Sequence, residues 1–139
     1  MEHIAILKPQ WKLMDKIISG RKTVESRWYM TKRAPWGRIK AGETVYFKEG
    51  RHVSAKAAVS DVLQLEVDNK KIKELLEKYH EKLGIENIDS VFSRRKNKKY
   101  CILVFLSDAQ KIEPFKISKK GFGNMSAWIC VDNIEKIKV

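Results

Sequence analysis

The segment from Ser19 to Trp28 constrains the fold most strongly, because it indicates a helix end followed directly by a strand. Gly20 tolerates positive φ and is typical of the residue at which a helix stops. Residues 23–28 are rich in β-branched and aromatic types, which favours a strand. Side chains on a strand alternate between its two faces, so Glu25 and Arg27 are predicted to share one face.

Lys22 and Arg21 precede this strand, at the turn, where alternation does not fix the direction of a side chain. The segment therefore predicts a compact cluster of mixed charge at the start of a strand. One interpretation is a binding cleft. The other is a solvated hairpin with surface ion pairs, each of which contributes only about 0–1 kcal/mol.

The remaining pattern predicts an α+β domain. A long strand with a bend near Ser60–Asp61 is expected, and Asp68 or Asn69 is expected to cap a helix that Gly84 ends. Residues 107–109 are predicted to form a turn. Pro114 predicts that the next strand, residues 111–117, lies at an edge of the sheet. The expected strands are residues 3–8, 23–28, 44–48, 53–65, 100–106, 111–117 and 127–131, and the expected helices are residues 10–18, 68–83 and 85–92.

The charge of the chain favours a polyanionic partner. With 29 Lys and Arg against 17 Asp and Glu in 139 residues, the formal net charge is +12. A positive field attracts nucleic acid and speeds its capture. Solubility or growth at high temperature is the alternative, although thermal adaptation enriches both signs of charge. The length predicts one domain, residues 1–139.

Basic residues also lie in segments that are expected to be loops. Trp36 stands among basic residues and is predicted either to stack on a base or to cover the end of the barrel. Residues 93–99 carry five cations and are expected to form an exposed loop, and residues 118–126 form a glycine-rich basic loop. The residues expected to contact nucleic acid are Arg21, Lys22, Glu25, Arg27, Trp36, Arg38, Lys48, Arg51, Arg94, Arg95, Lys119 and Lys120.

No pattern indicates a metal, a cofactor or a membrane span. Cys101 and Cys130 have apolar neighbours and are expected to be buried free thiols, and the three histidines lack the spacing of metal ligands. Apolar runs are too short to cross a bilayer, and no signal peptide is visible. We therefore expect a cytoplasmic protein.

The spacing Gly20-x-Lys22-x-x-Glu25-x-Arg27 resembles the G-x-K-x-x-E-x-R signature of ASCH domains, which belong to the PUA-like superfamily. The Gly-Glu-x-Val-x-Phe run that starts at Gly42 is similar to a second recurring element of these domains. The resemblance implies a PUA-like small mixed β-barrel with flanking helices, and an RNA-linked function. It also implies that Lys22, Glu25 and Arg27 line a cleft.

Three functions remain open at this stage. The first is an RNA-binding domain that holds a nucleotide or modified base in the cleft. The second is a small metal-independent hydrolase, a ribonuclease or a relative of the N4-acetylcytidine amidohydrolases, that uses Lys22 and Glu25 as catalytic residues. Glu25 stands where the amidohydrolase branch has a threonine, so its nucleophile is missing there. The third is a protein-interaction domain whose charge is incidental. The sequence does not indicate an oligomeric state.

Overall fold

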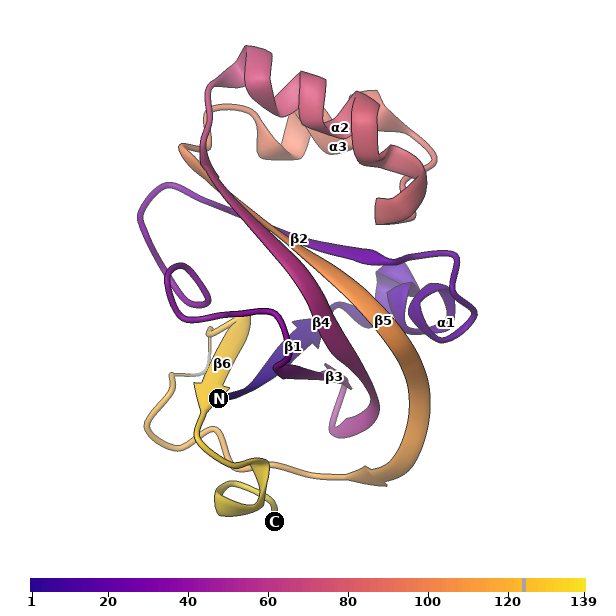
Figure 1. The fold of residues 1–139 in the computed structure, drawn as a ribbon, viewed down its shortest axis with the longest axis vertical. Helices are drawn as coiled ribbons and strands as arrows, with labels where there is room; N and C mark the ends of the chain where they lie inside the picture. The colour runs from indigo at the N-terminus through magenta and orange to yellow at the C-terminus, as the bar shows by residue number, and fades with distance from the viewer. Residues whose placement is uncertain (124) are drawn as a thin grey trace.

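The computed structural model describes residues 1–123 and 125–139, so Asn124 in the glycine-rich loop lies outside the described residues. A single sheet runs through the chain, with helices at one end and one side (Figure 1). The elements in order are β1 (Glu2–Leu7), η1 (Pro9–Trp11), α1 (Leu13–Ile18), β2 (Val24–Tyr29), β3 (Thr44–Glu49), β4 (His52–Glu66), α2 (Asn69–Leu83), α3 (Ile88–Arg95), β5 (Tyr100–Phe115), β6 (Trp128–Val131) and η2 (Ile134–Lys136).

The sheet has six strands in the order β2-β5-β4-β3-β1-β6. Strands β1 and β3 are parallel and the other pairs are antiparallel, so the sheet is mixed, as predicted. The long strands β4 and β5 curl strongly, which turns the sheet into a half-barrel (Figure 1). The predicted α+β class with a mixed sheet and flanking helices is confirmed, and the curled sheet is open, with β2 and β6 as its two edges.

Irregular pairing between β4 and β5 produces part of this curvature. The register shifts between Val59 and Asp61, where the sequence predicts a bend. The predicted turn at residues 107–109 is wrong: β5 continues to Phe115, and Asp108 sits at a register shift with φ of 53°. A bulge absorbs the extra residues and bends the strand without ending it. Strand β2 pairs only with the first part of β5, so Pro114 lies where one side of β5 has no strand beside it.

Helices α2 and α3 lie side by side over one end of the sheet (Figure 1). Of the two predicted caps, Asp68 caps α2 by accepting a hydrogen bond from the Lys71 amide, and Gly84 ends the helix in the left-handed region, as predicted. The buried stripe of α2 packs with Val24, Trp28 and Leu103 in a core of its own, separate from the core inside the curled sheet.

The other two predicted helices differ from the structure. Helix α3 begins at Ile88 and reaches Arg95, so the first part of the expected loop at residues 93–99 is helical. The first helix is broken at Lys12, whose φ of 53° separates a short 3-10 turn from α1. Because of this break, Trp11 does not share the buried face of Met14 and Ile17 and remains half-buried at the surface.

No helix in the described part of the chain is long and apolar enough to span a membrane.

Candidate nucleotide-binding pocket

A pocket of about 580 Å³ lies between strand β2, the segment after β1 and the ends of α2 and α3. The backbone places the signature residues at this pocket. The Lys22 amide donates to the Lys16 carbonyl of α1, and the Thr23 amide donates to the Lys82 carbonyl of α2. The start of β2 is therefore fixed to two helices at once. Glu25 and Arg27 line the pocket, as do Ser26, Trp28 and Tyr29 of the same strand.

Lys22 is almost fully buried, with 4% of its surface exposed. Its Nζ donates to the carbonyl oxygens of Val24 and Leu83, both at 2.8 Å, and lies 3.7 Å from Glu25 Oε2. Leu83 is the last residue of α2, where free carbonyls and the helix dipole favour a cation. Burial lowers the pKa of Lys22, and the charges of Arg27 and Lys16 add to this effect, whereas Glu25 opposes it.

Glu25 links the two cations of the signature. Its Oε1 lies 3.5 Å from Arg27 Nη2, while its Oε2 faces Lys22. Neither contact is a short hydrogen bond, and Glu25 Oε2 is buried without a hydrogen-bond partner. Arg27 Nε is also buried and unpaired. The carboxylate and the guanidinium are thus neutralised as charges but keep hydrogen-bonding capacity for a ligand.

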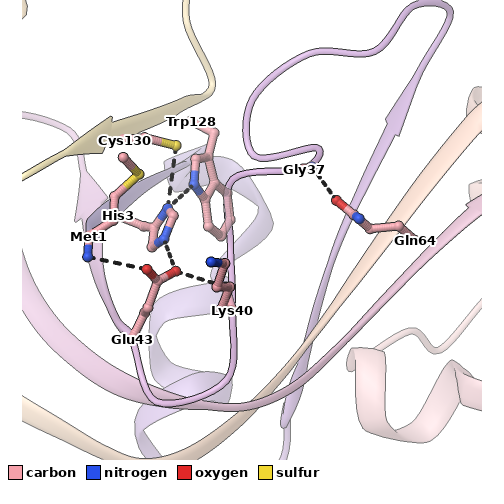
Figure 2. A network of polar contacts seen from close by, with 8 residues as sticks. All are labelled: Met1, His3, Gly37, Lys40, Glu43, Gln64, Trp128 and Cys130. Carbon is pink, nitrogen blue, oxygen red and sulfur yellow. Dashed lines mark hydrogen bonds and ion pairs between the residues drawn. The ribbon is translucent and has the colours of Figure 1, made fainter.

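Trp128 supports Arg27 from the side of β6, with the Arg27 Cζ atom 5.2 Å from the indole centroid. The Trp128 indole in turn donates from Nε1 to His3 Nδ1 at 3.1 Å (Figure 2). Indole nitrogen can only donate, so His3 Nδ1 accepts and Nε2 carries the proton given to Glu43 Oε1 at 2.9 Å. Burial lowers the pKa of His3, and the contact with Glu43 partly offsets this.

Several contacts fix the Glu43 carboxylate (Figure 2). Besides His3, it accepts from the Lys40 amide at 2.7 Å and forms an ion pair with the Met1 amino group at 3.2 Å. In the same view, the Gly37 amide donates to Gln64 Oε1 and ties the loop after β2 to strand β4. Sequence reasoning did not identify His3 or Trp128 as part of the support behind the pocket.

The structure brings together half of the residues expected to contact nucleic acid. Lys22, Glu25, Arg27, Arg94, Arg95 and Lys119 line the pocket. Lys119 Nζ also donates to the Ser126 carbonyl at 3.4 Å. Arg95 is half-buried, and its Nε has no hydrogen-bond partner. Burial and the neighbouring charge of Arg94 lower the pKa of Arg95.

The other expected residues do not line this pocket. Trp36 is half-buried and packs edge-on against Tyr100 at 5.2 Å between ring centroids. Lys48 is half-buried and donates to the Gly50 carbonyl. The other four expected residues have exposed side chains and do not line the pocket: Arg21, Arg38, Arg51 and Lys120.

Two further pocket residues, Trp11 and Lys8, were missed. Trp11 falls within the helix expected over residues 10–18, but the left-handed residue Lys12 separates it from α1. Its apolar neighbours at the pocket wall include Leu83, Ile85 and Val91. Among the described residues, no three His, Cys, Asp or Glu side chains are grouped in a way that could hold a metal ion.

No protein-family model and no curated protein sequence matches the chain. Solved structures do match it. The crystal structure of ASCH from Zymomonas mobilis aligns with a TM-score of 0.71 and 18% identity, over 97% of this chain and 90% of that one. A mutant of the same protein gives a TM-score of 0.71 and 19% identity, over 97% and 91%.

The N-terminal domain of Staphylothermus marinus McrB aligns less closely, with a TM-score of 0.52 and 18% identity, over 83% of this chain and 76% of that domain. Identities at this level establish a shared architecture. The resemblance drawn from the signature is therefore confirmed for the fold: this chain has the fold of the ASCH domains.

Proposed function

We propose that the protein binds RNA and holds one nucleotide or modified base in the pocket formed by Lys22, Glu25 and Arg27. One observation carries this proposal. Three buried polar atoms without hydrogen-bond partners, Glu25 Oε2, Arg27 Nε and Arg95 Nε, belong to residues that line this one pocket. Leaving such an atom unpaired costs about 1–3 kcal/mol, so their convergence favours a site that a polar ligand completes.

The chemistry of these atoms fits a nucleotide. A buried carboxylate accepts hydrogen bonds from exocyclic amino or ring N–H groups of a base, while guanidinium groups donate to phosphate or to carbonyl oxygens of a base. Leu83, Ile85 and Val91 supply apolar surface for the flat faces of the ring. The net charge of +12 gives the long-range attraction that a polyanion requires.

Binding can be tested with a fluorescent ten-residue single-stranded RNA, by anisotropy at moderate salt. We expect Arg27→Gln and Glu25→Gln each to weaken binding about tenfold, since each removes a charge-assisted hydrogen bond. Arg51→Gln is the matched control, because Arg51 is exposed and does not line the pocket. Equal affinities for all four proteins would exclude the pocket as the binding site.

A hydrolase is the second candidate, and one observation favours it. Lys22 combines a lowered pKa with a position beside a buried carboxylate, an arrangement that serves acid–base or nucleophilic chemistry. Against it, two backbone carbonyls accept hydrogen bonds from Nζ and favour the protonated, non-nucleophilic form.

The two candidates can be separated by incubating the protein with RNA and with a panel of modified nucleosides and analysing the products by mass spectrometry. A hydrolase forms a product that disappears in Lys22→Met and Glu25→Gln variants that still unfold cooperatively. A binding domain forms no product with any of these substrates.

A further inference from the structure

Four residues at one side of the pocket form a cluster that the signature does not explain. Trp11 lies at its centre, with Lys8 Nζ at 4.8 Å, Arg94 Cζ at 5.4 Å and Arg95 Cζ at 5.8 Å from the indole centroid. Lys8 and Trp11 come from the segment after β1, while the two arginines end helix α3. All four line the pocket, and Lys8 and Arg94 are also exposed to solvent.

The charges of this cluster are not neutralised within the described part of the chain. No ion pair within 4.0 Å joins Lys8, Arg94 or Arg95 to an acidic side chain there, whereas Lys22 and Arg27 share Glu25. Three like charges around one ring repel each other, and the face of the indole offsets only part of this repulsion. The Arg94 guanidinium donates to Ser90 Oγ at 3.1 Å, which uses one of its five N–H groups.

An anion with several acceptor oxygens is the ligand that such a cluster suits. Guanidinium groups bind phosphate oxygens in pairs, and a lysine adds a mobile charge. Burial lowers the pKa of Arg95, the charges of Arg94 and Arg27 add to this effect, and the charge of Glu25 opposes it. A phosphate at this place relieves the repulsion and can accept from the N–H groups of Arg94 that Ser90 does not use.

We propose that Lys8, Arg94 and Arg95, gathered around Trp11, form a phosphate subsite beside the base pocket, so that the protein binds an extended single strand of RNA in preference to a free nucleoside. This inference rests on the proposed function, because it takes the pocket as the place of one base. The strand leaves the pocket along the cluster, and its next phosphate lies between the two arginines and Lys8. A base in the pocket cannot be paired, which excludes an intact duplex at this position.

The first test measures how RNA affinity depends on salt. The triple variant Lys8→Gln/Arg94→Gln/Arg95→Gln should flatten the slope of log K against log salt by about 0.7 for each phosphate contact that it removes. Its affinity for RNA should fall at least tenfold at moderate salt, and its affinity for a free nucleoside, which has no phosphate, should fall less. The triple variant Arg21→Gln/Arg51→Gln/Lys120→Gln removes the same charge from exposed positions away from the pocket lining, and its slope should change less.

The outcomes distinguish the two proposals. If RNA binding depends on Glu25 but the two triple variants show equal slopes and affinities, the phosphate subsite is wrong and the pocket stands. If neither Glu25→Gln nor the Lys8/Arg94/Arg95 variant changes RNA binding, both are wrong. If single-stranded DNA and single-stranded RNA bind with equal affinity, the phosphate subsite is supported and the partner is single-stranded nucleic acid in general.

A second test does not require RNA. Inorganic pyrophosphate is titrated into the protein while the Nε–Hε resonances of the arginine side chains are followed by NMR. The Arg94 and Arg95 signals should shift and saturate in the wild type and in Arg51→Gln. If the Arg94 and Arg95 signals do not shift, the phosphate subsite is wrong. If they shift and saturate with pyrophosphate but the protein binds no RNA, the subsite is supported and the proposed function is wrong.

Discussion

Lys22 carries an ammonium group at a position where only 4% of its surface is exposed. Such a position is costly unless every partner is present. The carbonyls of Val24 and Leu83 and the carboxylate of Glu25 supply those partners. Lys22 therefore connects the start of β2 with the end of α2 at the pocket. The effect of a Lys22 substitution on the free energy of unfolding can be measured separately from its effect on binding.

We expect Lys22→Met to lower the free energy of unfolding by about 3–5 kcal/mol, because the variant leaves the Glu25 carboxylate buried without one of its two cations. The double variant Lys22→Met/Glu25→Gln should lower the free energy of unfolding less, since it leaves no unpaired carboxylate in the interior. Lys71→Met is the control: its ion pair with Glu74 is exposed, and such pairs contribute about 0–1 kcal/mol. Urea unfolding measures all four proteins, and equal losses for Lys22→Met and Lys71→Met would contradict the buried pair.

The pH dependence of folding should report His3. Burial lowers the pKa of His3 from 6.5, so the unfolded chain binds this proton at a higher pH than the folded chain does. The free energy of unfolding therefore falls as the pH drops below 6.5, until the folded-state pKa is reached, and is full above 6.5. His3→Gln should remove this part of the pH dependence in urea titrations between about pH 7.5 and pH 5.

A variant of the hydrogen-bond partner provides the matched control for His3. Trp128→Phe keeps an aromatic ring but removes the Nε1 donor that holds His3 Nδ1 unprotonated. The pKa of His3, followed by NMR of the imidazole nitrogens, should rise in this variant. A wild-type His3 that titrates above 6.5, or with the proton on Nδ1 at neutral pH, would contradict the assigned network.

Residue-level prediction succeeded where the signal is local. Alternation along one strand predicted a shared face for Glu25 and Arg27, the signature implied a cleft with Lys22, and all three residues line the pocket. Trp11 and Arg95 could not be placed in the same way. Their positions depend on a left-handed residue at Lys12 and on a helix that ends three residues later than its apolar pattern, and neither feature has a clear sequence signal.

At the scale of elements, the end of α2 is a structural part of the site. Gly84 ends the helix with φ of 72°, and a Cβ atom built there would lie 3.3 Å from both Lys16 Cδ and Lys22 Cβ. The Gly84 carbonyl also accepts a hydrogen bond from Lys16 Nζ at 2.9 Å. The helix terminus thus fixes the backbone of the signature as well as its lysine.

Gly84→Ala should therefore destabilise the protein and also disturb the pocket. The left-handed conformation alone costs about 1–2 kcal/mol for a residue with a Cβ atom, and the contact with Lys22 adds to this cost. Gly20→Ala is the matched control, since Gly20 has φ of 82° but no atom within 4 Å of a Cβ there. Urea unfolding and RNA anisotropy should show a larger loss for Gly84→Ala in both measurements, and equal losses would contradict the packing of Lys22 against this turn.

The elements differ in how far their sequences determine them. Helix α2 has a side-chain cap, a regular stripe and a glycine stop, and both of its predicted boundaries lie within one residue of the observed ones. Strand β5 was divided at residues 107–109 because Ser-Asp-Ala reads as a turn, whereas pairing with β4 carries the strand through a bulge. Strand continuity is decided by the neighbouring strand, which a local pattern does not contain.

At the scale of the whole molecule, the parts that surround the pocket differ in how deeply their residues are buried. Strands β4 and β5 pair along most of their length, and residues 101–104 are fully buried. By contrast, none of the eight residues of α3, all of which the structure describes, is fully buried. The wall that carries Arg94 and Arg95 is therefore held by fewer interior contacts than the wall that carries Glu25 and Arg27.

This difference predicts a pattern of hydrogen exchange. Amides of residues 101–104 should exchange only through global unfolding, while amides of α3 should exchange faster through local opening. Saturating single-stranded RNA should slow exchange in α3 more than in β6, because a ligand that contacts Arg94 and Arg95 stabilises the closed form of the helix that carries them. Glu25→Gln should reduce this protection at a fixed RNA concentration, whereas Arg51→Gln should leave it unchanged. Protection spread evenly over the whole chain would instead indicate binding that does not engage the α3 wall.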